Sequence, residues 1–237
     1  MGIVCALTTE ARHFKPGLRP SDSVVSLDDG TLLSLSGMGS AAAAAGARAS
    51  IGAGAAALIS FGLAGGLDPL LRAGDVCLPR EILSPNIPSI AAAVAWRERV
   101  SAAVQTRIPQ ARIFEGGLLS HPTLVASIPA KSRLFASSRA IAVDMESFAV
   151  AEVAAAHRLP FLAVRVIVDG ATDRLPPIVT RAADAYGEIR PWALVMGLLR
   201  APSDLAGLVQ LGYRYRSAGR MLTDISRIGA WSRLAFP

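Results

Sequence analysis

The stretch Ala140–Gly170, AIAVDMESFAVAEVAAAHRLPFLAVRVIVDG, decides the fold because a strand, a helix and a second strand follow one another within it. Ala140–Val143 is a short apolar run, Met145–His157 is rich in alanine with helical spacing of larger apolar residues, and Phe161–Val168 is apolar and β-branched. A helix of this length between two apolar strands predicts a neighbouring parallel pair that is covered on both faces.

Acidic residues follow the predicted strands of this unit. Asp144 is placed to cap the helix, and Glu146 and Asp169 come just after the two strands. A third carboxylate, Glu10, follows the apolar run Gly2–Leu7 at the start of the chain. Because open α/β sheets bind ligands beyond the carboxyl ends of their strands, these acids predict a ligand site there.

The size and composition of the chain indicate one α/β domain with a terminal appendage. The chain has 237 residues, of which 52% are hydrophobic, and a formal net charge of +6. Only Lys15 and Lys131 are lysines, so nearly all of the positive charge is arginine. A basic chain suits nucleic acid, an anionic membrane surface or a phosphorylated ligand, but no nucleic-acid-binding motif is present. We therefore expect no nucleic-acid partner.

The cysteines and the first residues predict a cytoplasmic protein. Cys5 and Cys77 lie in apolar runs, as small buried hydrophobes do, and the chain begins directly as a strand without signal-peptide features. Ala49–Leu67 carries no charge and has the length of a membrane span, but five glycines interrupt it. We expect a helix over Ala41–Ala53, a strand over Ala57–Phe61 and a glycine turn after it.

The remaining pattern supplies further elements and a distinct tail. The expected elements are a hairpin of Val24–Leu27 and Thr31–Ser36, a strand over Asp75–Leu78, a loop containing Pro85 and Pro88, a helix within Ser89–Ile108, a strand over Arg112–Leu119, and helices over Pro129–Ser138 and Ile178–Leu199. Pro202–Pro237 is basic, with aromatic residues interspersed.

The absence of other motifs leaves acid–base and hydrogen-bond chemistry by carboxylates. The sequence has no dinucleotide-binding fingerprint, no phosphate-loop lysine and no metal-ligand spacing. His13, His121 and His157 are scattered, and a lone histidine is more often structural than a ligand. We expect neither a metal nor an organic cofactor.

Four motifs together resemble the nucleoside phosphorylase and nucleosidase superfamily. They are Glu10 after the first strand, Gly62-Leu63-Ala64-Gly65-Gly66-Leu67 followed by Gly74-Asp75-Val76, Ala142-Val143-Asp144-Met145-Glu146-Ser147, and Val164-Arg165-Val166-Ile167-Val168-Asp169. The resemblance spans about Gly2–Leu199. It implies a three-layer αβα sandwich with a mixed, largely parallel central sheet over residues 1–200, a C-terminal helical extension over 201–237, and a homo-oligomer.

The resemblance implies a role for each acid. Asp169 matches the aspartate that gives a proton to N7 of a departing purine, and Glu10 matches the glutamate that positions and deprotonates water in the hydrolytic members. Glu146 matches the acceptor of hydrogen bonds from the ribose hydroxyls, with Met145 beside the sugar. The purely structural alternatives are a turn cap for Asp169, a favourable charge in the first helical turn for Glu146, an exposed acid for Glu10 and core packing for Met145.

Apolar side chains and the glycine turn complete the expected substrate site. The resemblance places Leu124 and Val125 against the purine faces. The turn that contains Leu63 and Gly65 lets the backbone approach a ligand closely.

The nucleophile remains open between water and inorganic phosphate as a co-substrate. Where the phosphorylases carry an arginine and a serine, this chain has Ser60 and Leu63, and their N-terminal phosphate loop is missing. Phosphate would need other donors, such as Ser40, Arg48 or Arg165. The presence of Glu10 favours water, whereas a resemblance to one phosphorylase subfamily, given in the next paragraph, favours phosphate.

Within the superfamily, the block Leu118–Ser147 and the basic tail are most similar to the hopanoid-associated phosphorylases. This implies cleavage of the N-ribosyl bond of adenosylhopane, a lipid-linked adenine nucleoside, with the tail either contacting the inner face of the membrane or packing on the domain. The alternatives are a methylthioadenosine/S-adenosylhomocysteine nucleosidase, another purine nucleoside phosphorylase, or a non-catalytic nucleoside-binding protein.

Overall fold

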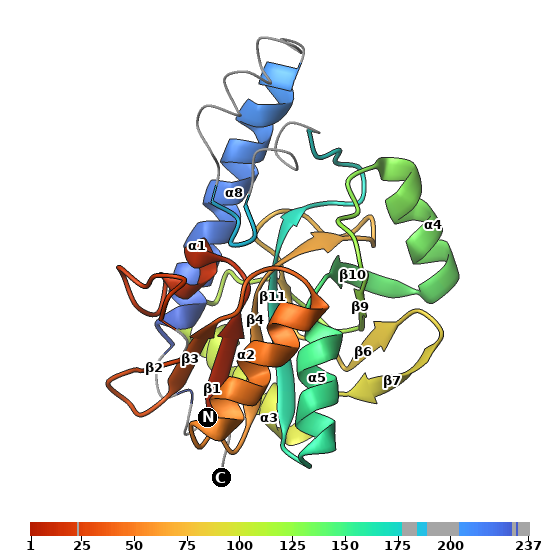
Figure 1. Cartoon of the computed structure of the whole chain (residues 1–237). Helices are drawn as coiled ribbons and strands as arrows, with labels where there is room; N and C mark the ends of the chain where they lie inside the picture. The colour runs from red at the N-terminus through yellow and green to blue at the C-terminus, as the bar shows by residue number, and fades with distance from the viewer. Residues whose placement is uncertain (23, 177–183, 189–203, 229–230, 232–237) are drawn as a thin grey trace.

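The computed structural model describes residues 1–22, 24–176, 184–188, 204–228 and 231 (Figure 1). The strands are β1 (Gly2–Cys5), β2 (Val25–Ser26), β3 (Leu32–Leu35), β4 (Leu58–Gly66), β5 (Val76–Cys77), β6 (Glu81–Ser84), β7 (Ile87–Ala91), β8 (Ile113–Phe114), β9 (Gly117–Ser120), β10 (Ala140–Asp144) and β11 (Phe161–Asp169). The helices are α1 (Thr8–Ala11), α2 (Ser40–Gly52), α3 (Val94–Arg107), α4 (Ile128–Ser138), α5 (Ser147–Ala156) and α8 (Asp204–Ser226).

The described strands form one mixed sheet whose centre is parallel. One path through it runs β2-β3-β1-β4-β10-β9-β6-β7, while β11 pairs with β4 and with β5. β1 runs parallel to both β3 and β4, and β11 runs parallel to β4. The antiparallel pairs are β2 with β3, β4 with β10, β5 with β11 and β6 with β7. This is the mixed, largely parallel sheet that the resemblance implies.

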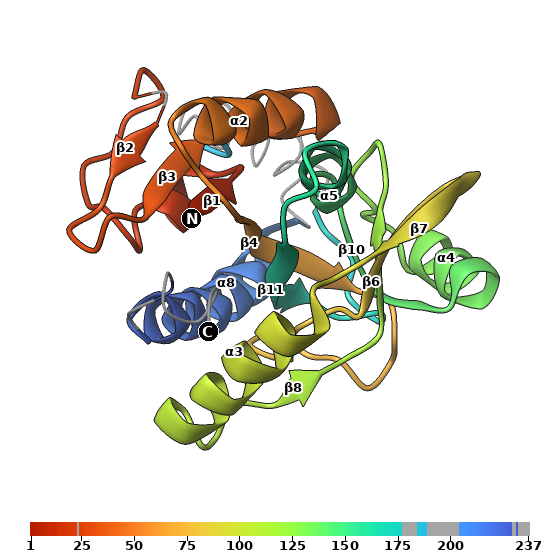
Figure 2. The ribbon, with the colours of Figure 1, turned by 90° about the horizontal axis from the view of Figure 1, so that it is seen from below.

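Helices cover both faces of the sheet. Figure 2 shows α2 and α5 on one face and α3 and α8 on the other. Side chains alternate along β11: Leu162 and Val164 enter the cluster with α3 and α8, whereas Ala163 and Ile167 enter the cluster with α2 and α5. The three-layer αβα sandwich is therefore confirmed, and the continuous apolar runs are explained by burial on both faces.

The two strands of the opening stretch are not a neighbouring parallel pair, so that prediction is wrong. β4 lies between them, parallel to β11 and antiparallel to β10. The backbone of Gly65 pairs with Val143 of β10 and with Asp169 of β11. The reason is that β4 continues past Phe61 and offers its last residues to β10, which the sequence alone does not indicate.

The predicted glycine turn is the second half of β4, which extends to Gly66. The predicted loop around Pro85 and Pro88 is instead the antiparallel hairpin of β6 and β7. Arg112–Leu119 holds two short strands, β8 and β9, in place of one. Strands distant in sequence pair with β4, β6, β8 and β9, whereas β7 pairs with β6 just before it. Local composition does not report the distant partners.

The predicted helix Ile178–Leu199 falls mostly outside the described residues, but its centre is a turn. The side chain of Asp184 accepts hydrogen bonds from the backbone N–H groups of Tyr186 and Glu188, each at 2.9 Å, and Gly187 has φ +73°. These local bonds replace helical ones over 184–188, so the helix is not continuous.

The C-terminal helix α8 packs on the sheet. Ala218, Leu222, Ile225 and Trp231 are buried with the α3 face of the core. Polar contacts also join this helix to the domain: Arg214 forms an ion pair with Asp173, and Tyr215 hydrogen-bonds Thr9. Among the described residues, no helix is long and apolar enough to cross a bilayer.

Candidate active site

The expected acids gather around the carboxyl half of β4. Glu10 accepts a hydrogen bond from the backbone N–H of Leu63 at 2.7 Å. Two residues further along β4, a Cβ on Gly65 would lie 3.5 Å from Oδ2 of Asp169. The structure thus brings Glu10 and Asp169, 159 positions apart in the printed sequence, to one strand end.

Glu10 is buried in a cage of backbone donors. It is 2% exposed, and its carboxylate accepts from the N–H groups of Ala6 at 3.1 Å and Leu7 at 2.9 Å as well as from Leu63. A Cβ on Gly62 would overlap this carboxylate, so only glycine fits there. Burial raises the pKa of Glu10, and the nearby Arg165 guanidinium opposes that rise. The alternative that Glu10 is an exposed acid in a turn is therefore excluded.

Glu146 lies at the start of α5 and faces the start of α2. Its Oε1 accepts a hydrogen bond from the backbone N–H of Gly39 at 2.8 Å. Burial, followed by repulsion from Asp144, raises the pKa of Glu146 to about 7 against the opposing charge of Arg165. This carboxyl therefore titrates in the neutral range and links two elements at the sheet edge.

A buried polar network fixes the junction of β10 and α5. Arg165 donates to Asp144 through Nε at 2.9 Å, and its Nη2 donates to the hydroxyl oxygens of Ser60 at 2.6 Å and Ser147 at 3.0 Å. Asp144 also accepts from the backbone N–H of Ser147, the first residue of α5, at 3.1 Å, although the N-cap position itself is Glu146 and not Asp144 as expected. Because every partner is buried, this network holds the residues next to Glu146 in one geometry.

Asp169 ends β11, is 2% exposed, and pairs with Lys131 of α4. The following turn is held by Asp173, whose carboxylate accepts from the backbone N–H of Gly170 at 2.9 Å. Asp173, and not Asp169, therefore caps this turn. Burial raises the pKa of Asp169, and the Lys131 ammonium opposes that rise.

Lys131 is the site residue that sequence reasoning missed. It lies in the predicted helix Pro129–Ser138, where a lysine normally marks a solvent-facing position, yet it is fully buried. One signal was present: lysine is rare in this arginine-dominated chain.

The apolar candidates are distributed between the surface and the core. Leu124 is 51% exposed, whereas Val125 is buried with Leu119 and Val143 in the cluster under α4. Leu63 and Met145 are half-buried. Of the two residues expected to flank a base, Leu124 is the accessible one.

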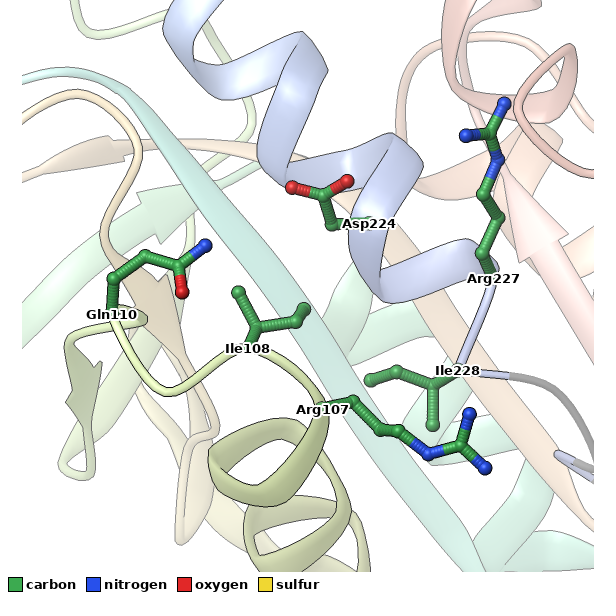
Figure 3. A pocket seen from close by; sticks show the side chains of 6 residues that line it. All are labelled: Arg107, Ile108, Gln110, Asp224, Arg227 and Ile228. Carbon is green, nitrogen blue, oxygen red and sulfur yellow. The ribbon is translucent and has the colours of Figure 1, made fainter.

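One histidine, His13, and a surface pocket lie apart from this group of acids. His13 hydrogen-bonds Thr223 of α8 at 2.9 Å, a structural contact. A pocket of about 300 Å³ lies between the ends of α3 and α8 (Figure 3), and its lining includes Arg107 and Arg227 but none of the candidate site residues. Among the described residues, no group of three or more His, Cys, Asp or Glu side chains is placed to bind a metal.

A family model described as the phosphorylase superfamily matches residues 26–185. The chain belongs to this superfamily. Its relative from Baumannia cicadellinicola, a 5′-methylthioadenosine/S-adenosylhomocysteine nucleosidase, is 28% identical over 165 residues, which cover 58% of this chain and 67% of the relative. Membership of this superfamily makes the chain an enzyme that cleaves an N-glycosyl bond.

Solved structures share the fold at low identity. The methylthioadenosine/S-adenosylhomocysteine nucleosidase of Neisseria meningitidis gives a TM-score of 0.66 at 20% identity, covering 94% of this chain and 96% of that one. The futalosine hydrolase of Helicobacter pylori gives 0.65 at 16% identity, covering 94% and 95%. These likenesses establish the superfamily fold for nearly the whole chain.

Proposed function

We propose that this phosphorylase-superfamily member hydrolyses the N-ribosyl bond of an adenine nucleoside, with water as the nucleophile. The observation that carries the proposal is the buried Glu10 carboxylate against β4. Three backbone donors fix its position, and its raised pKa makes it a stronger proton acceptor than an ordinary carboxylate.

In the proposed reaction, the bond from C1′ to N9 breaks and its electron pair stays with the base. Asp169 gives its proton to N7, so that the base leaves as neutral adenine. Water forms the new bond to C1′ and passes a proton to Glu10. Glu146 accepts hydrogen bonds from the ribose hydroxyls and thereby favours the positively charged, oxocarbenium-like transition state.

The surroundings of β4 favour water over phosphate. The hydroxyl of Ser60 is engaged by Arg165 and Ser147 inside the buried network. The same network occupies Arg165 through Asp144. Arg48 is exposed on α2, and Leu63 supplies no polar side chain. Of the donors named for phosphate, Arg165 is therefore occupied by protein partners, and Ser40 and Arg48 are exposed on α2.

The substituent at C5′ divides the proposal into two variants. Two of the three proteins named above are called methylthioadenosine/S-adenosylhomocysteine nucleosidases, so small thioadenosines are the first substrates to expect. The sequence resemblance instead favours adenosylhopane, whose large apolar group would require a membrane-proximal enzyme. A homo-oligomer and a cytoplasmic location are expected for both variants, and membrane contact of the C-terminal helix is expected for the second alone.

A substrate panel tests the proposal. Methylthioadenosine, S-adenosylhomocysteine, adenosine and adenosylhopane in mixed micelles are each incubated with the enzyme, and adenine is measured by chromatography. Release from at least one compound is expected. Binding of these compounds by calorimetry without any release of adenine would refute the proposal and favour a nucleoside-binding protein.

The base assignment is tested in the same assay. Glu10→Gln should reduce adenine release by about 10²-fold or more, because water loses its proton acceptor. Glu98→Gln is the matched control, since Glu98 is exposed on α3. Equal activity of the two variants would refute the role of Glu10.

A further inference from the structure

Lys131 occupies a position that ordinary lysines avoid. Its side chain is 0% exposed. Its Nζ contacts three acceptors: Oδ2 of Asp169, the carbonyl oxygen of Gly170 at 2.6 Å and that of Asp173 at 3.0 Å. An ammonium group has three protons to donate, so these three partners use all of them.

Burial of the Lys131 ammonium is energetically unfavourable. Removing an ammonium from water costs several kcal/mol, which an ion pair and good hydrogen bonds only partly offset. The chain has only one other lysine, Lys15, and that residue is exposed. Attachment of α4 to the domain therefore does not by itself account for a buried lysine whose three protons are all bonded beside the candidate acid.

The other charges near Asp169 are already matched with each other. Asp173 holds the backbone N–H of Gly170 and forms an ion pair with Arg214 of α8 at 2.7 Å. In the described part of the chain, Lys131 is the cation that directly contacts the Asp169 carboxylate. Lys131 binds Oδ2, one of the two oxygens of this carboxylate.

We propose that Lys131 is a positioning residue for N7 protonation: it holds Oδ2 of Asp169, directs Oδ1 toward the purine and neutralises the carboxylate that remains once the proton has left. The inference rests on the proposed function. The O–H bond of Asp169 breaks, the N7–H bond forms, and the new carboxylate pairs with the Lys131 ammonium, which itself keeps all its protons.

The electrostatics of Asp169 agree with this role. Burial raises its pKa, Lys131 lowers it, Asp173 raises it and Arg214 lowers it. A neutral carboxyl is needed before the reaction and a tolerable carboxylate after it. Burial favours the first and Lys131 the second.

The first test replaces Lys131 with a neutral side chain of similar length. Lys131→Met should lower kcat for adenine release roughly 10²-fold with little change in KM, since the acid becomes too weak rather than the substrate unbound. The pH at which activity falls on the alkaline side should move upward, because Asp169 then keeps its proton to higher pH. Lys15→Met is the matched control and should behave as wild type.

Charge retention and leaving-group dependence separate this role from plain packing. Lys131→Arg keeps the positive charge and should recover part of the lost kcat and the original alkaline limb. A 4-nitrophenyl riboside leaves without protonation, so Lys131→Met should cleave it at nearly the wild-type rate. Equal loss on both substrates, or an unmoved alkaline limb, would overturn the proposal.

A double-mutant cycle decides the question even if Lys131→Met is poorly stable. Asp169→Asn removes the partner through which Lys131 acts, so Lys131→Met should cost nothing more in that background. Additive losses would overturn the inference. Failure of the proposed function is distinguishable, because wild-type enzyme would then release no adenine from any compound in the panel.

Discussion

The two buried carboxylates of the site are assigned different work by their partners. Glu10 is surrounded by backbone N–H groups, whereas Asp169 is paired with an ammonium. Backbone donors hold the Glu10 carboxylate in place, and the Arg165 guanidinium near it is itself paired with Asp144. An adjacent cation stabilises the carboxylate that an acid leaves behind, so the environments match the two proposed roles.

At this residue scale, Asp169→Asn should lower kcat by about 10²- to 10⁴-fold, because an amide cannot deliver the proton to N7. Substrate affinity should survive, since asparagine retains the shape of the side chain. Single-turnover kinetics with separate equilibrium binding check both halves. Near-normal turnover would mean that another group protonates the base.

Glu146 predicts a pH dependence of activity near neutrality. Its pKa is raised to about 7, and only the ionised form accepts hydrogen bonds from both ribose hydroxyls. We expect kcat/KM of wild type to fall as the pH drops through about 7. In Glu146→Gln that acidic limb should disappear and the plateau should be lower, as pH profiles of both proteins would reveal.

The same shift has a consequence for stability, with a definite sign. A carboxyl whose folded pKa of about 7 exceeds its ordinary value of 4.5 stabilises the fold at low pH and loses that contribution as the pH rises through 7. Glu146→Gln should therefore melt at a higher temperature than wild type at pH 8. A lower melting temperature at pH 8 would contradict the assigned shift.

The individual acids were predictable from the sequence, but their partners were not. Glu10, Glu146 and Asp169 follow apolar runs and match a family pattern. Lys131 and Gly39, which bind two of them, come from a distant helix and a distant turn. Such pairings depend on tertiary packing, and spacing along the chain carries no record of them.

At the scale of elements, the second half of β4 determines where Glu10 lies. Gly62 in this strand leaves the space that the Glu10 carboxylate and the Arg165 guanidinium occupy. The sequence predicted close approach at these glycines but placed it in a turn. The error arose because glycine is common in turns and unusual inside a strand, where it marks close contact.

Gly62→Ala should therefore displace Glu10 and reduce adenine release by at least about 10-fold, since misplacement of a catalytic group by roughly 1 Å can cost 10²-fold. Gly52→Ala is the matched control, because a Cβ at Gly52 meets nothing within 4 Å. Steady-state kinetics of the two variants make the comparison. Equal activity would show that Glu10 is not held against β4.

The tail helix α8 is part of the core rather than a detachable appendage. Leu222 is 2% exposed and lies in the same cluster as β11 and α3. Leu222→Ala should lower the free energy of unfolding by about 2–5 kcal/mol. Val209→Ala, at a side chain that is 51% exposed on the same helix, should change it by less than about 0.5 kcal/mol.

Urea denaturation measures both variants. A small effect of Leu222→Ala would mean that α8 is only loosely attached. Because α8 is packed, membrane binding is better tested on the intact chain, with liposomes of anionic and neutral composition, than on a truncated one. Charge composition alone left packing and membrane contact open, since an amphipathic basic helix serves either purpose.

At the scale of the whole molecule, the architecture followed from the sequence more fully than the pairing of strands. The αβα layers follow from apolar runs alternating with helical segments. The position of β4 between β10 and β11 did not, because crossover length sets the direction of a strand but not the number of strands it passes. The superfamily fold nevertheless brings the three acids together at one edge.

The central claim is that water attacks the N-ribosyl bond, and one measurement tests it most directly. Adenine release from the best substrate of the panel is followed in phosphate-free buffer and again with inorganic phosphate, and the sugar product is identified by mass spectrometry. We expect equal rates of adenine release and a free sugar in both buffers. Release that requires phosphate and yields a sugar 1-phosphate would contradict it.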